Sequence, residues 1–398
     1  MRLAPLTYWR SVFELRSGRK TLLDRAANRL GLAVSGLWTR DWIADVARQR
    51  FMMPVNAALE PGAVLVNGRW LMDAPVDFPP PPFAATQDSQ IVYLSCDATL
   101  AARLEPADLL EPDRRARLLD SVECAPIEAV MLDYLWTLVD RNADALLADW
   151  SGGDRSIEGQ VSSSAVVLEP DFVRIGPQAV VDPTAVIDAR QGPIYIDEGA
   201  RISPHTLIVG PAYIGPGSVI KPHSYIHGGT TIGPMCKVAG EIDACIISGY
   251  TNKQHEGFLG HSYVGSWVNL GAGTVNSDLK NTYGPVRIPL NGRETDTNLT
   301  FFGAVIGDHV KTGIQQTLAT GTVLGFAAMA SCSRILPRFL PSFSWLTDEG
   351  TVPGDPERLL KTAVRVMDRR RVTCSEAEEK LFRALPRISQ AYESDRPA

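Results

Sequence analysis

A six-residue repeat of aliphatic side chains dominates the middle of the chain. Glycine or proline follows the repeated position by one or two residues in most units, as in IGPGSV. A period of six fits neither an α-helix, with ~3.6 residues per turn, nor an alternating strand, with a period of ~2. It predicts a hexapeptide parallel β-helix over residues 163–338, in which each unit forms one flat side. Eight repeated positions run without a break: Ile196, Ile202, Ile208, Ile214, Ile220, Ile226, Ile232 and Val238.

The regions on either side of the repeat have different patterns. Residues 1–150 alternate strand-like runs (AVSGLW, AVLVNG, QIVYLS) with helical runs (TLLDRAANRL, RDWIADVAR, PIEAVMLDYLWTLVDRNADALL), which predicts an α/β domain. Gly152 and Gly153 mark a linker to the repeat. Residues 339–398 contain a loop and then helical periodicity, so we expect a helical tail that packs on the β-helix or on a neighbouring subunit.

Composition and charge narrow the class of protein. The chain has 398 residues, of which 45% are hydrophobic and 21% charged, as in a globular protein of two or three domains. No run approaches the ~18 to 20 apolar residues that cross a bilayer, and the charged start lacks a signal peptide, so we expect a cytoplasmic protein without a membrane partner. Six scattered cysteines predict reduced thiols. The net charge of -6 argues against a nucleic-acid partner.

All six histidines lie within the predicted β-helix. His205 and His223 are 18 residues apart, which is one turn of three hexapeptides, so we expect them to stack on one corner, with His227 four residues further on. They have two interpretations. They are solvated corner residues, or they are ligands and bases of a site.

A polar segment interrupts the repeat between Asn252 and Gly284. Asn252 replaces an expected apolar residue, and around His255 the polar residues Lys253, Glu256, His261 and Asn269 lie close together in sequence. A coil with a structural role alone does not need such residues. The interruption therefore predicts a functional site on the rigid wall that the regular coils supply.

Several stretches together resemble a known family of enzymes. They run from PLTYWRSVFELRSG through VLVNGR to NKQHEGFLGHSYVGSWVNLGAGTVNSDLKNTYGPV and PSFSW, and so cover nearly the whole chain. They resemble the bifunctional bacterial enzymes that acetylate glucosamine-1-phosphate and then make UDP-N-acetylglucosamine, and within that group a divergent sugar nucleotidyltransferase branch. The resemblance implies a left-handed β-helix acyltransferase. It also implies acetyl-CoA as co-substrate, an amino sugar phosphate or nucleotide sugar as acceptor, and a homotrimer.

The resemblance assigns the catalytic positions. His255 looks like the family's catalytic histidine, and Asn269 follows at the family's spacing. An amine that attacks a thioester needs a base that works near neutral pH, and the imidazole, with an ordinary pKa of ~6.5, is suited to that step. Asn269 and the backbone N–H groups of Gly271, Ala272 and Gly273 are candidate donors to the thioester oxygen and contacts for acetyl-CoA.

The same resemblance assigns substrate contacts. Lys221, in a Lys-Pro pair, takes the position of the family's phosphate-binding arginine. A second family lysine has no counterpart, and Lys237 and Lys253 are the candidates to replace it. The family's tyrosine three residues after the histidine is Phe258, and its sugar-binding lysine aligns near Lys280 and Tyr283. These departures leave the identity of the amino sugar open.

The N-terminal region departs further from the family. Its nucleotidyltransferases place a glycine-rich loop directly after the first strand, where backbone N–H groups hold the triphosphate. Here the chain begins at MRLAPLT, past that strand, and LRSGRK offers one glycine. We therefore expect a degenerate nucleotide site or an incomplete start, and Mg²⁺ only if this domain is active.

Two other functions stay open. One is a catalytically degenerate protein that binds a nucleotide sugar. The other is a hydratase resembling γ-type carbonic anhydrases, with three histidines around Zn²⁺ across a subunit boundary, for which His205, His223 and His227 are the candidates.

Overall fold

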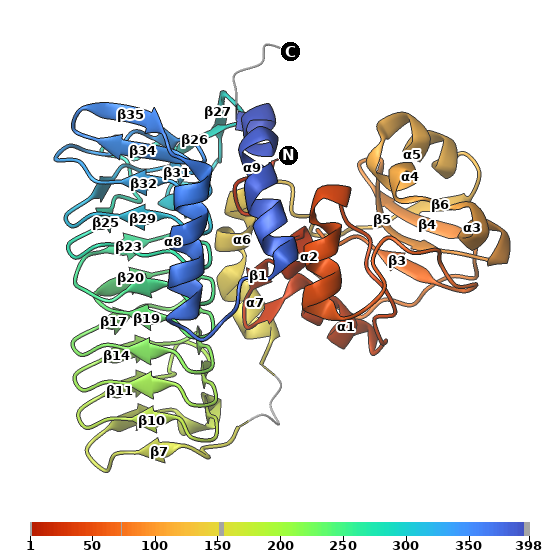
Figure 1. Cartoon of the computed structure of the whole chain (residues 1–398). Coiled ribbons are helices and arrows are strands. Elements are labelled where there is room, and N and C mark those ends of the chain that lie inside the picture. The colour runs from red at the N-terminus through yellow and green to blue at the C-terminus, as the bar shows by residue number, and fades with distance from the viewer. Residues whose placement is uncertain (1, 73, 151–154, 394–398) are drawn as a thin grey trace. The chain divides into compact units, whose positions relative to one another are not determined.

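The computed structural model, shown in Figure 1, describes residues 2–72, 74–150 and 155–393. It contains an N-terminal α/β region, a parallel β-helix between residues 160 and 346, and two C-terminal helices, which confirms the predicted fold class. In the part of the chain that it covers, no helix is long and apolar enough to cross a membrane. The chain forms two compact units: Met1–Trp9, Arg16–Arg19 and Tyr134–Ala398 in one, and Arg10–Leu15 and Lys20–Asp133 in the other.

The second unit is built on a four-stranded sheet of order β3-β5-β4-β6. The predicted strands at residues 63–68 and 90–95 form β3 and β5, and the first two predicted helices form α1 and α2. The elements of this unit are α1 (Leu22–Leu30), α2 (Asp41–Phe51), β3 (Val64–Val66), β4 (Phe83–Gln87), β5 (Gln90–Ser95), α3 (Ala98–Arg103), α4 (Pro106–Leu110), α5 (Pro112–Leu119) and β6 (Glu123–Pro126), with β2 (Lys20–Thr21) and the short helix η1 (Val12–Glu14) before α1.

Two local predictions for this region are wrong. The run AVSGLW forms no strand, because Leu37 is buried against Ala44 and Ala47 of α2 and makes only an isolated bridge to Val55. The long helix predicted over residues 126–147 is shortened to α6 (Leu135–Asp140) and α7 (Asn142–Ala148). Residues 127–134 stay extended because their backbone bonds to the 69–71 segment, through Leu71 N–H to Val130 O at 2.9 Å.

The β-helix has three sheets of short parallel strands stacked as a column (Figure 1). The first sheet has the order β22-β19-β16-β13-β10-β7, the second β23-β20-β17-β14-β11-β8, and the third β33-β31-β28-β24-β21-β18-β15-β12-β9. We call the corner between the first and second sheets the first edge, and the corner between the second and third sheets the second edge. The first-sheet strands are β7 (Gln160–Val161), β10 (Val180–Val181), β13 (Arg201–Ile202), β16 (Val219–Ile220), β19 (Lys237–Val238) and β22 (Asn252–Lys253). The second-sheet strands are β8 (Val166–Leu168), β11 (Val186–Asp188), β14 (Leu207–Val209), β17 (Tyr225–Ile226), β20 (Glu241–Asp243) and β23 (Leu259–Gly260), and the third-sheet strands are β9 (Val173–Ile175), β12 (Ile194–Ile196), β15 (Ala212–Ile214), β18 (Thr230–Ile232), β21 (Ile246–Ile247), β24 (Tyr263–Val264), β28 (Ala304–Ile306), β31 (Thr322–Leu324) and β33 (Phe339–Leu340).

The hexapeptide repeat faces the interior as predicted. All eight repeated residues from Ile196 to Val238 are fully buried. Beyond Val238 the spacing shortens, and the strand register places Lys253 opposite Val238 and Asn252 opposite Lys237. The prediction that Asn252 takes the apolar position is therefore wrong. Lys253 occupies it, with 2% of its surface exposed.

Further strands extend the column, and between residues 277 and 303 the chain leaves it and returns. β25 (Val275–Asn276) pairs with β30 (Thr317–Leu318), and β29 (Lys311–Thr312) continues into β32 (Met329–Ala330), β34 (Ser344–Thr347) and β35 (Gly350–Pro353). Residues 277–303 form an excursion from the second edge that contains the hairpin of β26 (Arg287–Leu290) and β27 (Arg293–Asp296). β24 pairs directly with β28 across it. The remaining short elements of the unit are β1 (Arg16–Ser17) and η2 (Pro170–Phe172).

The C-terminal tail is helical as predicted. α8 (Pro356–Asp368) begins at Asp355, whose carboxylate accepts from two N–H groups of its first turn, and α9 (Glu376–Glu393) follows it. Met367 and Cys374 are buried with Trp267 of the β-helix in one apolar cluster. The segment that joins the two helices is therefore fixed on the coil that carries the polar interruption.

Candidate active site

The turns of the first edge stack directly on one another. His205 and His223 lie on this edge with their ring centroids 4.9 Å apart and nearly parallel, which confirms the predicted stacking. Further along, a Cβ atom at Gly257 would lie 2.4 Å from Thr274 O of the next turn. The turn of residues 254–257, which carries His255, is therefore packed against the turn that carries Gly271, Ala272 and Gly273.

A buried lysine holds the His255 turn in place. The Lys253 ammonium donates to the carbonyls of Ala239, at 3.0 Å, and of His255, at 2.8 Å. Burial lowers the pKa of Lys253 to about 8. The His255 side chain is exposed on the edge. Lys253 thus points away from the surface on which a substrate would bind, and its contact with the histidine is through the backbone.

Asn269 and the glycine turn follow on the next coil. Asn269 forms ladder bridges to Asn252 on one side and Lys311 on the other. The Gly271 N–H already donates to Thr312 Oγ1 at 3.0 Å, so it has no capacity left for a substrate. Among the residues that the structure describes, no acceptor is found for the backbone N–H groups of Ala272 and Gly273. Of the three N–H groups predicted as donors in this turn, these two are the ones without an acceptor among the described residues.

The predicted substrate contacts are divided between the two edges. Lys221 lies on the first edge, half-exposed, and its carbonyl accepts from the hydroxyls of Thr206 and Ser224. Lys280 and Tyr283 lie in the 277–303 excursion, which leaves from the second edge. Within one chain, the structure brings Lys221, His255 and Ala272 to one edge and leaves Lys280 and Tyr283 on the other.

The other three predicted substrate contacts, Lys280, Tyr283 and Phe258, differ in how strongly the fold holds them. The Lys280 ammonium donates to Pro285 O at 3.0 Å, so it stabilises the start of the excursion. Tyr283 is 73% exposed. Phe258 is half-buried beside Gly260, and Leu259, one residue later, takes the inward position opposite Ile242.

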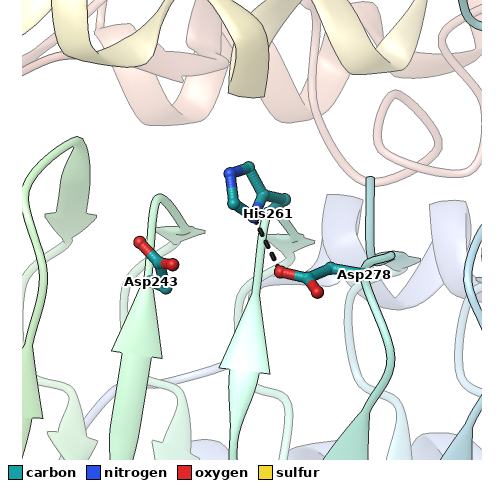
Figure 2. A group of neighbouring side chains, drawn as sticks. All are labelled: Asp243, His261 and Asp278. Atoms are coloured by element: carbon teal, nitrogen blue, oxygen red, sulfur yellow. Dashed lines mark hydrogen bonds and ion pairs between the residues drawn. The ribbon is translucent and has the colours of Figure 1, made fainter. Parts of the chain in front are cut away.

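A histidine–aspartate pair lies on the second edge; the sequence pointed to His261 as part of the polar interruption but not to its partner Asp278. His261 Nδ1 lies 2.8 Å from Asp278 Oδ2, and Asp243 lies on the neighbouring coil (Figure 2). The ligand atoms of these three residues lie within 4.8 Å of one another. With Nδ1 bonded to the carboxylate, Nε2 of His261 is the nitrogen left to accept a proton, which is the arrangement of an oriented general base. The missing part was Asp278, 17 residues after His261, which the next coil brings beside the histidine.

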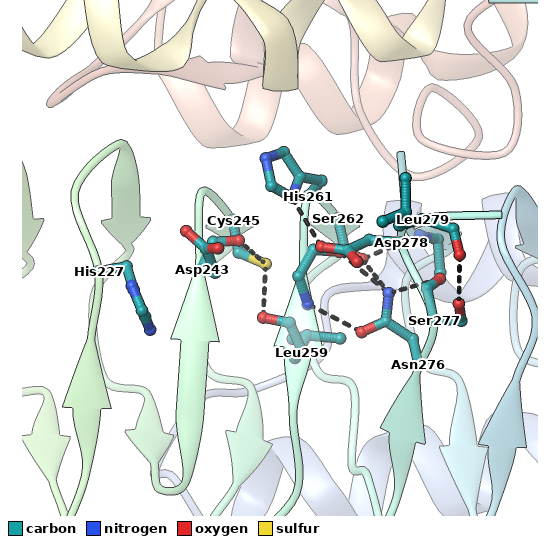
Figure 3. A network of polar contacts seen from close by, with 12 residues as sticks. His227, Asp243, Cys245, Leu259, His261, Ser262, Asn276, Ser277, Asp278 and Leu279 are labelled. Carbon is teal, nitrogen blue, oxygen red and sulfur yellow. Dashed lines mark hydrogen bonds and ion pairs between the residues drawn. The ribbon is translucent and has the colours of Figure 1, made fainter. Parts of the chain in front are cut away.

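A buried amide positions this pair. The Asn276 side chain accepts from Gly260 N–H at 2.8 Å and donates to Gly260 O at 3.0 Å, so it clamps the residue before His261 (Figure 3). The His261 ring also stacks on Phe301, with centroids 5.3 Å apart. Both contacts fix the imidazole against Asp278.

The histidines proposed for a zinc site are not brought together in one chain. His205 and His223 lie on the first edge, and Thr184 Oγ1 lies 2.9 Å from His205 Nδ1. His227 lies on the second edge, where Nε2 lies 3.0 Å from Glu241 Oε1. Among the described residues, the grouping of possible metal ligands is Asp243, His261 and Asp278 instead.

Gly18, the glycine of LRSGRK, is used for packing. Its N–H donates to Asn142 Oδ1 at 2.7 Å, and its carbonyl accepts from Thr231 Oγ1 at 3.0 Å. The N–H, which is the group that could donate to a phosphate, is therefore already engaged by a side chain.

Comparisons with known proteins agree with the two-part architecture. Residues 1–154 match the family model described as sugar nucleotidyl transferase. The bifunctional protein GlmU of Methanococcus vannielii is 33% identical over 113 residues, which are 28% of this chain and 27% of that protein. A bifunctional sugar-1-phosphate nucleotidylyltransferase/acetyltransferase of Sulfurisphaera tokodaii is 34% identical over 85 residues, 21% of each chain. The chain thus matches only about a quarter of the length of the first of these relatives.

A crystal structure of a UDP-N-acetylglucosamine acyltransferase shares 12% identity and a TM-score of 0.28, over 54% of this chain and 79% of that one. At so low a TM-score, that likeness gives no information about the residues of the site. The chain therefore joins a segment that matches the sugar nucleotidyl transferase family to a hexapeptide β-helix, and it is distantly similar to bifunctional GlmU proteins.

Proposed function

We propose that the β-helix is an acetyl-CoA-dependent N-acetyltransferase that acts on an amino sugar phosphate, such as glucosamine-1-phosphate, or on a nucleotide-linked amino sugar. One observation carries the proposal. The repeat breaks at the turn that carries His255, the histidine is exposed, and a buried ammonium on the interior side holds its backbone. The names of the bifunctional relatives support the same class of reaction.

His255 acts as the general base in this proposal. Acetyl-CoA supplies the acetyl group as a thioester. The imidazole removes a proton from the acceptor amine while the amine nitrogen forms a bond to the thioester carbonyl carbon. The carbon–sulfur bond then breaks, and the imidazolium returns the proton to the leaving thiolate, so the products are an acetamide and free CoA. A positioned base of this kind contributes roughly 10²- to 10⁴-fold to the rate.

Three further groups stabilise the charge on the thioester oxygen in this proposal. The N–H groups of Ala272 and Gly273 lie in the turn packed next to the His255 turn, and they have no acceptor among the described residues. Asn269 precedes this turn on the first sheet and offers a side-chain amide. Donors of this kind act because they are in place before the charge develops.

The assay that tests this function measures CoA release from acetyl-CoA with glucosamine-1-phosphate and with several UDP- or dTDP-linked amino sugars. We expect turnover with at least one phosphorylated amino sugar, and acetylation at its nitrogen. Absence of CoA release across the whole panel would contradict the proposal.

The division of residues between two edges favours a homotrimer as the active form. If a neighbouring copy places its second edge against the first edge of this chain, Lys280 and Tyr283 of one copy reach the His255 turn of the next. Light scattering at micromolar concentration should then give about three times the mass of the 43.3 kDa chain. A fully active monomer would refute this arrangement.

A second candidate function concerns the N-terminal region. The engagement of Gly18 by Asn142 and Thr231 favours binding of a nucleotide sugar over nucleotidyl transfer, because this glycine is not available to hold a triphosphate. We expect UDP-N-acetylglucosamine to bind without pyrophosphate exchange. Mg²⁺-dependent exchange between UTP and the sugar phosphate would show an active nucleotidyltransferase instead.

A further inference from the structure

The segment after α8 brings two arginines to the first sheet. Met367 and Cys374, on either side of this segment, are 2% and 9% exposed and pack with Trp267. Between them, Arg370 Nη2 donates to the side-chain oxygen of Asn252 at 2.7 Å. The arginine is therefore held on the coil that carries the polar interruption, by a packed anchor and a direct hydrogen bond.

The strand register places two lysines next to this contact. Asn252 pairs with Lys237 across the first sheet, so both side chains stand on the same outer face. Lys237 in turn pairs with Val219, and Lys221 is two residues further along the same strand direction. Lys221 is bonded into this ladder, because its N–H donates to Val238 O at 2.8 Å.

No acidic partner of the four cations of this patch is found in the part of the chain that the structure describes. Within the described residues, none of Lys221, Lys237, Arg369 and Arg370 forms an ion pair with a carboxylate. Burial first, and then the charges of Arg370, Lys221 and Arg369, lower the pKa of Lys237. The neighbouring charges that act on Lys237 are thus all positive, and a polyanion that binds among them would relieve their repulsion.

We propose that the two tail arginines join Lys221 and Lys237 in one anion site, which binds a phosphate or pyrophosphate group of a substrate. Guanidinium groups bind phosphate oxygens through paired N–H donors, whereas the lysines add compact charge. The site is built from the β-helix and from the C-terminal tail, which lies outside the 1–154 segment that matches the family model. The identity of the phosphate-bearing substrate rests on the proposed acetyltransferase function, but anion binding does not.

A structural role explains only part of this patch. Arginines at the end of α8 interact favourably with the negative end of the helix dipole, which accounts for Arg369 and Arg370 as helix-terminal residues. It does not account for a hydrogen bond from Arg370 to Asn252, nor for Lys237 and Lys221 on the facing sheet. A measurement of binding therefore separates the two explanations.

Calorimetric titration of the full chain with inorganic pyrophosphate tests the site without any turnover. We expect Arg370→Gln and Lys237→Gln each to weaken pyrophosphate binding about tenfold to a hundredfold, since each removes one charge-assisted contact. Arg387→Gln, which removes an exposed arginine from α9, is the matched control and should bind like the wild type. Melting temperatures of all variants, measured in parallel, show whether the fold is intact.

Two comparisons identify the source of the phosphate. If the acceptor supplies it, Arg370→Gln should raise the KM for glucosamine-1-phosphate but not that for glucosamine. If CoA supplies it, the same variant should lose the preference for CoA over 3′-dephospho-CoA in a binding assay. Either pattern supports a phosphate site at this place.

The proposal is overturned if the folded wild-type chain does not bind pyrophosphate. It is also overturned if Arg370→Gln and Lys237→Gln bind it within twofold of wild type, or if the Arg387 control loses as much affinity. Pyrophosphate binding without any CoA release would leave the anion site standing and refute only the acetyltransferase function.

Discussion

The ammonium of Lys253 lies inside the β-helix and donates to the backbone carbonyl of His255, 2.8 Å away. A cation thus occupies a position that is aliphatic in the coils before it, where Val181, Ile202, Ile220 and Val238 face inward. Burying a charge is unfavourable unless it is hydrogen-bonded, and here two carbonyls accept from it. The interior of the scaffold and the exposed histidine are therefore coupled through one side chain.

Replacing Lys253 tests whether its ammonium positions the His255 turn for catalysis. We expect Lys253→Met to lower kcat about tenfold to a hundredfold, because the His255 carbonyl loses its donor and the turn can shift. The oligomeric mass in light scattering should equal that of the wild type. An unaltered kcat in a folded variant would show that the ammonium does not position the histidine.

The pH dependence of unfolding gives an independent measure of the buried ammonium. Its folded pKa of about 8 lies below the ordinary value of 10.5, so the unfolded chain binds more protons between these two pH values. The free energy of unfolding of the wild type should therefore rise from pH 8 to pH 10.5 by about 3 kcal/mol relative to Lys253→Met. Lys361→Met, at an exposed position of α8, should show no such difference. Parallel urea titrations across this pH range test both.

The two candidate bases, His255 and His261, can be distinguished by substitution. We expect His255→Ala to fold and to lose roughly two to four orders of magnitude in kcat. His205→Ala, on the same edge, should keep most of the rate. If instead His261→Ala and Asp278→Asn abolish activity while His255→Ala stays within a few-fold of wild type, the base is His261, oriented by its carboxylate.

If the anion site binds the phosphate of the acceptor, Lys221 contacts the acceptor and not acetyl-CoA. Lys221→Ala should raise the KM for the acceptor about tenfold or more, as expected for one lost charge-assisted contact, with little change for acetyl-CoA. Initial-rate kinetics with each substrate varied in turn provide the test. An equal rise in both KM values would indicate a structural effect.

Glycine at position 257 is required by the stacking of the first edge. Its φ of 129° is unfavourable for residues with a Cβ atom, and such an atom would lie 2.4 Å from Thr274 O. We expect Gly257→Ala to lower the free energy of unfolding by about 2 to 4 kcal/mol. Gly199→Ala is the control, since Gly199 has a φ of 63° with no atom near its would-be Cβ, and it should cost only about 1 kcal/mol. Equal losses in the two variants would contradict the steric argument.

The fold could be predicted because the repeat reports directly on burial. Each position from Ile196 to Val238 that the period selected is fully buried. The period fails at Asn252 because the coil after Val238 is shorter, and a strand shifted by one residue exchanges its inward and outward side chains. AVSGLW has the composition of a strand, yet tertiary packing against α2 decides its conformation.

The candidate active site could be predicted from the sequence only in part, because some of its contacts join residues that are far apart along the chain. His255 stands out because a polar run replaces aliphatic residues along the chain. The pairing of His261 with Asp278 joins residues 17 positions apart on neighbouring coils, and its geometry depends on the Asn276 clamp. Arg370 reaches Asn252 across 118 positions, through the packing of the tail, which no local pattern encodes.

The excursion of residues 277–303 begins and ends at the same place. Phe302 N–H donates to Asp278 O at 2.8 Å, Leu279 forms a bridge to Phe301, and β24 pairs with β28 as if the excursion were absent. Its length and sequence can therefore change in evolution, or be exchanged by design, without disturbing the ladder that supports it. We expect related chains to vary their acceptor preference by replacing this one insert on an unchanged scaffold.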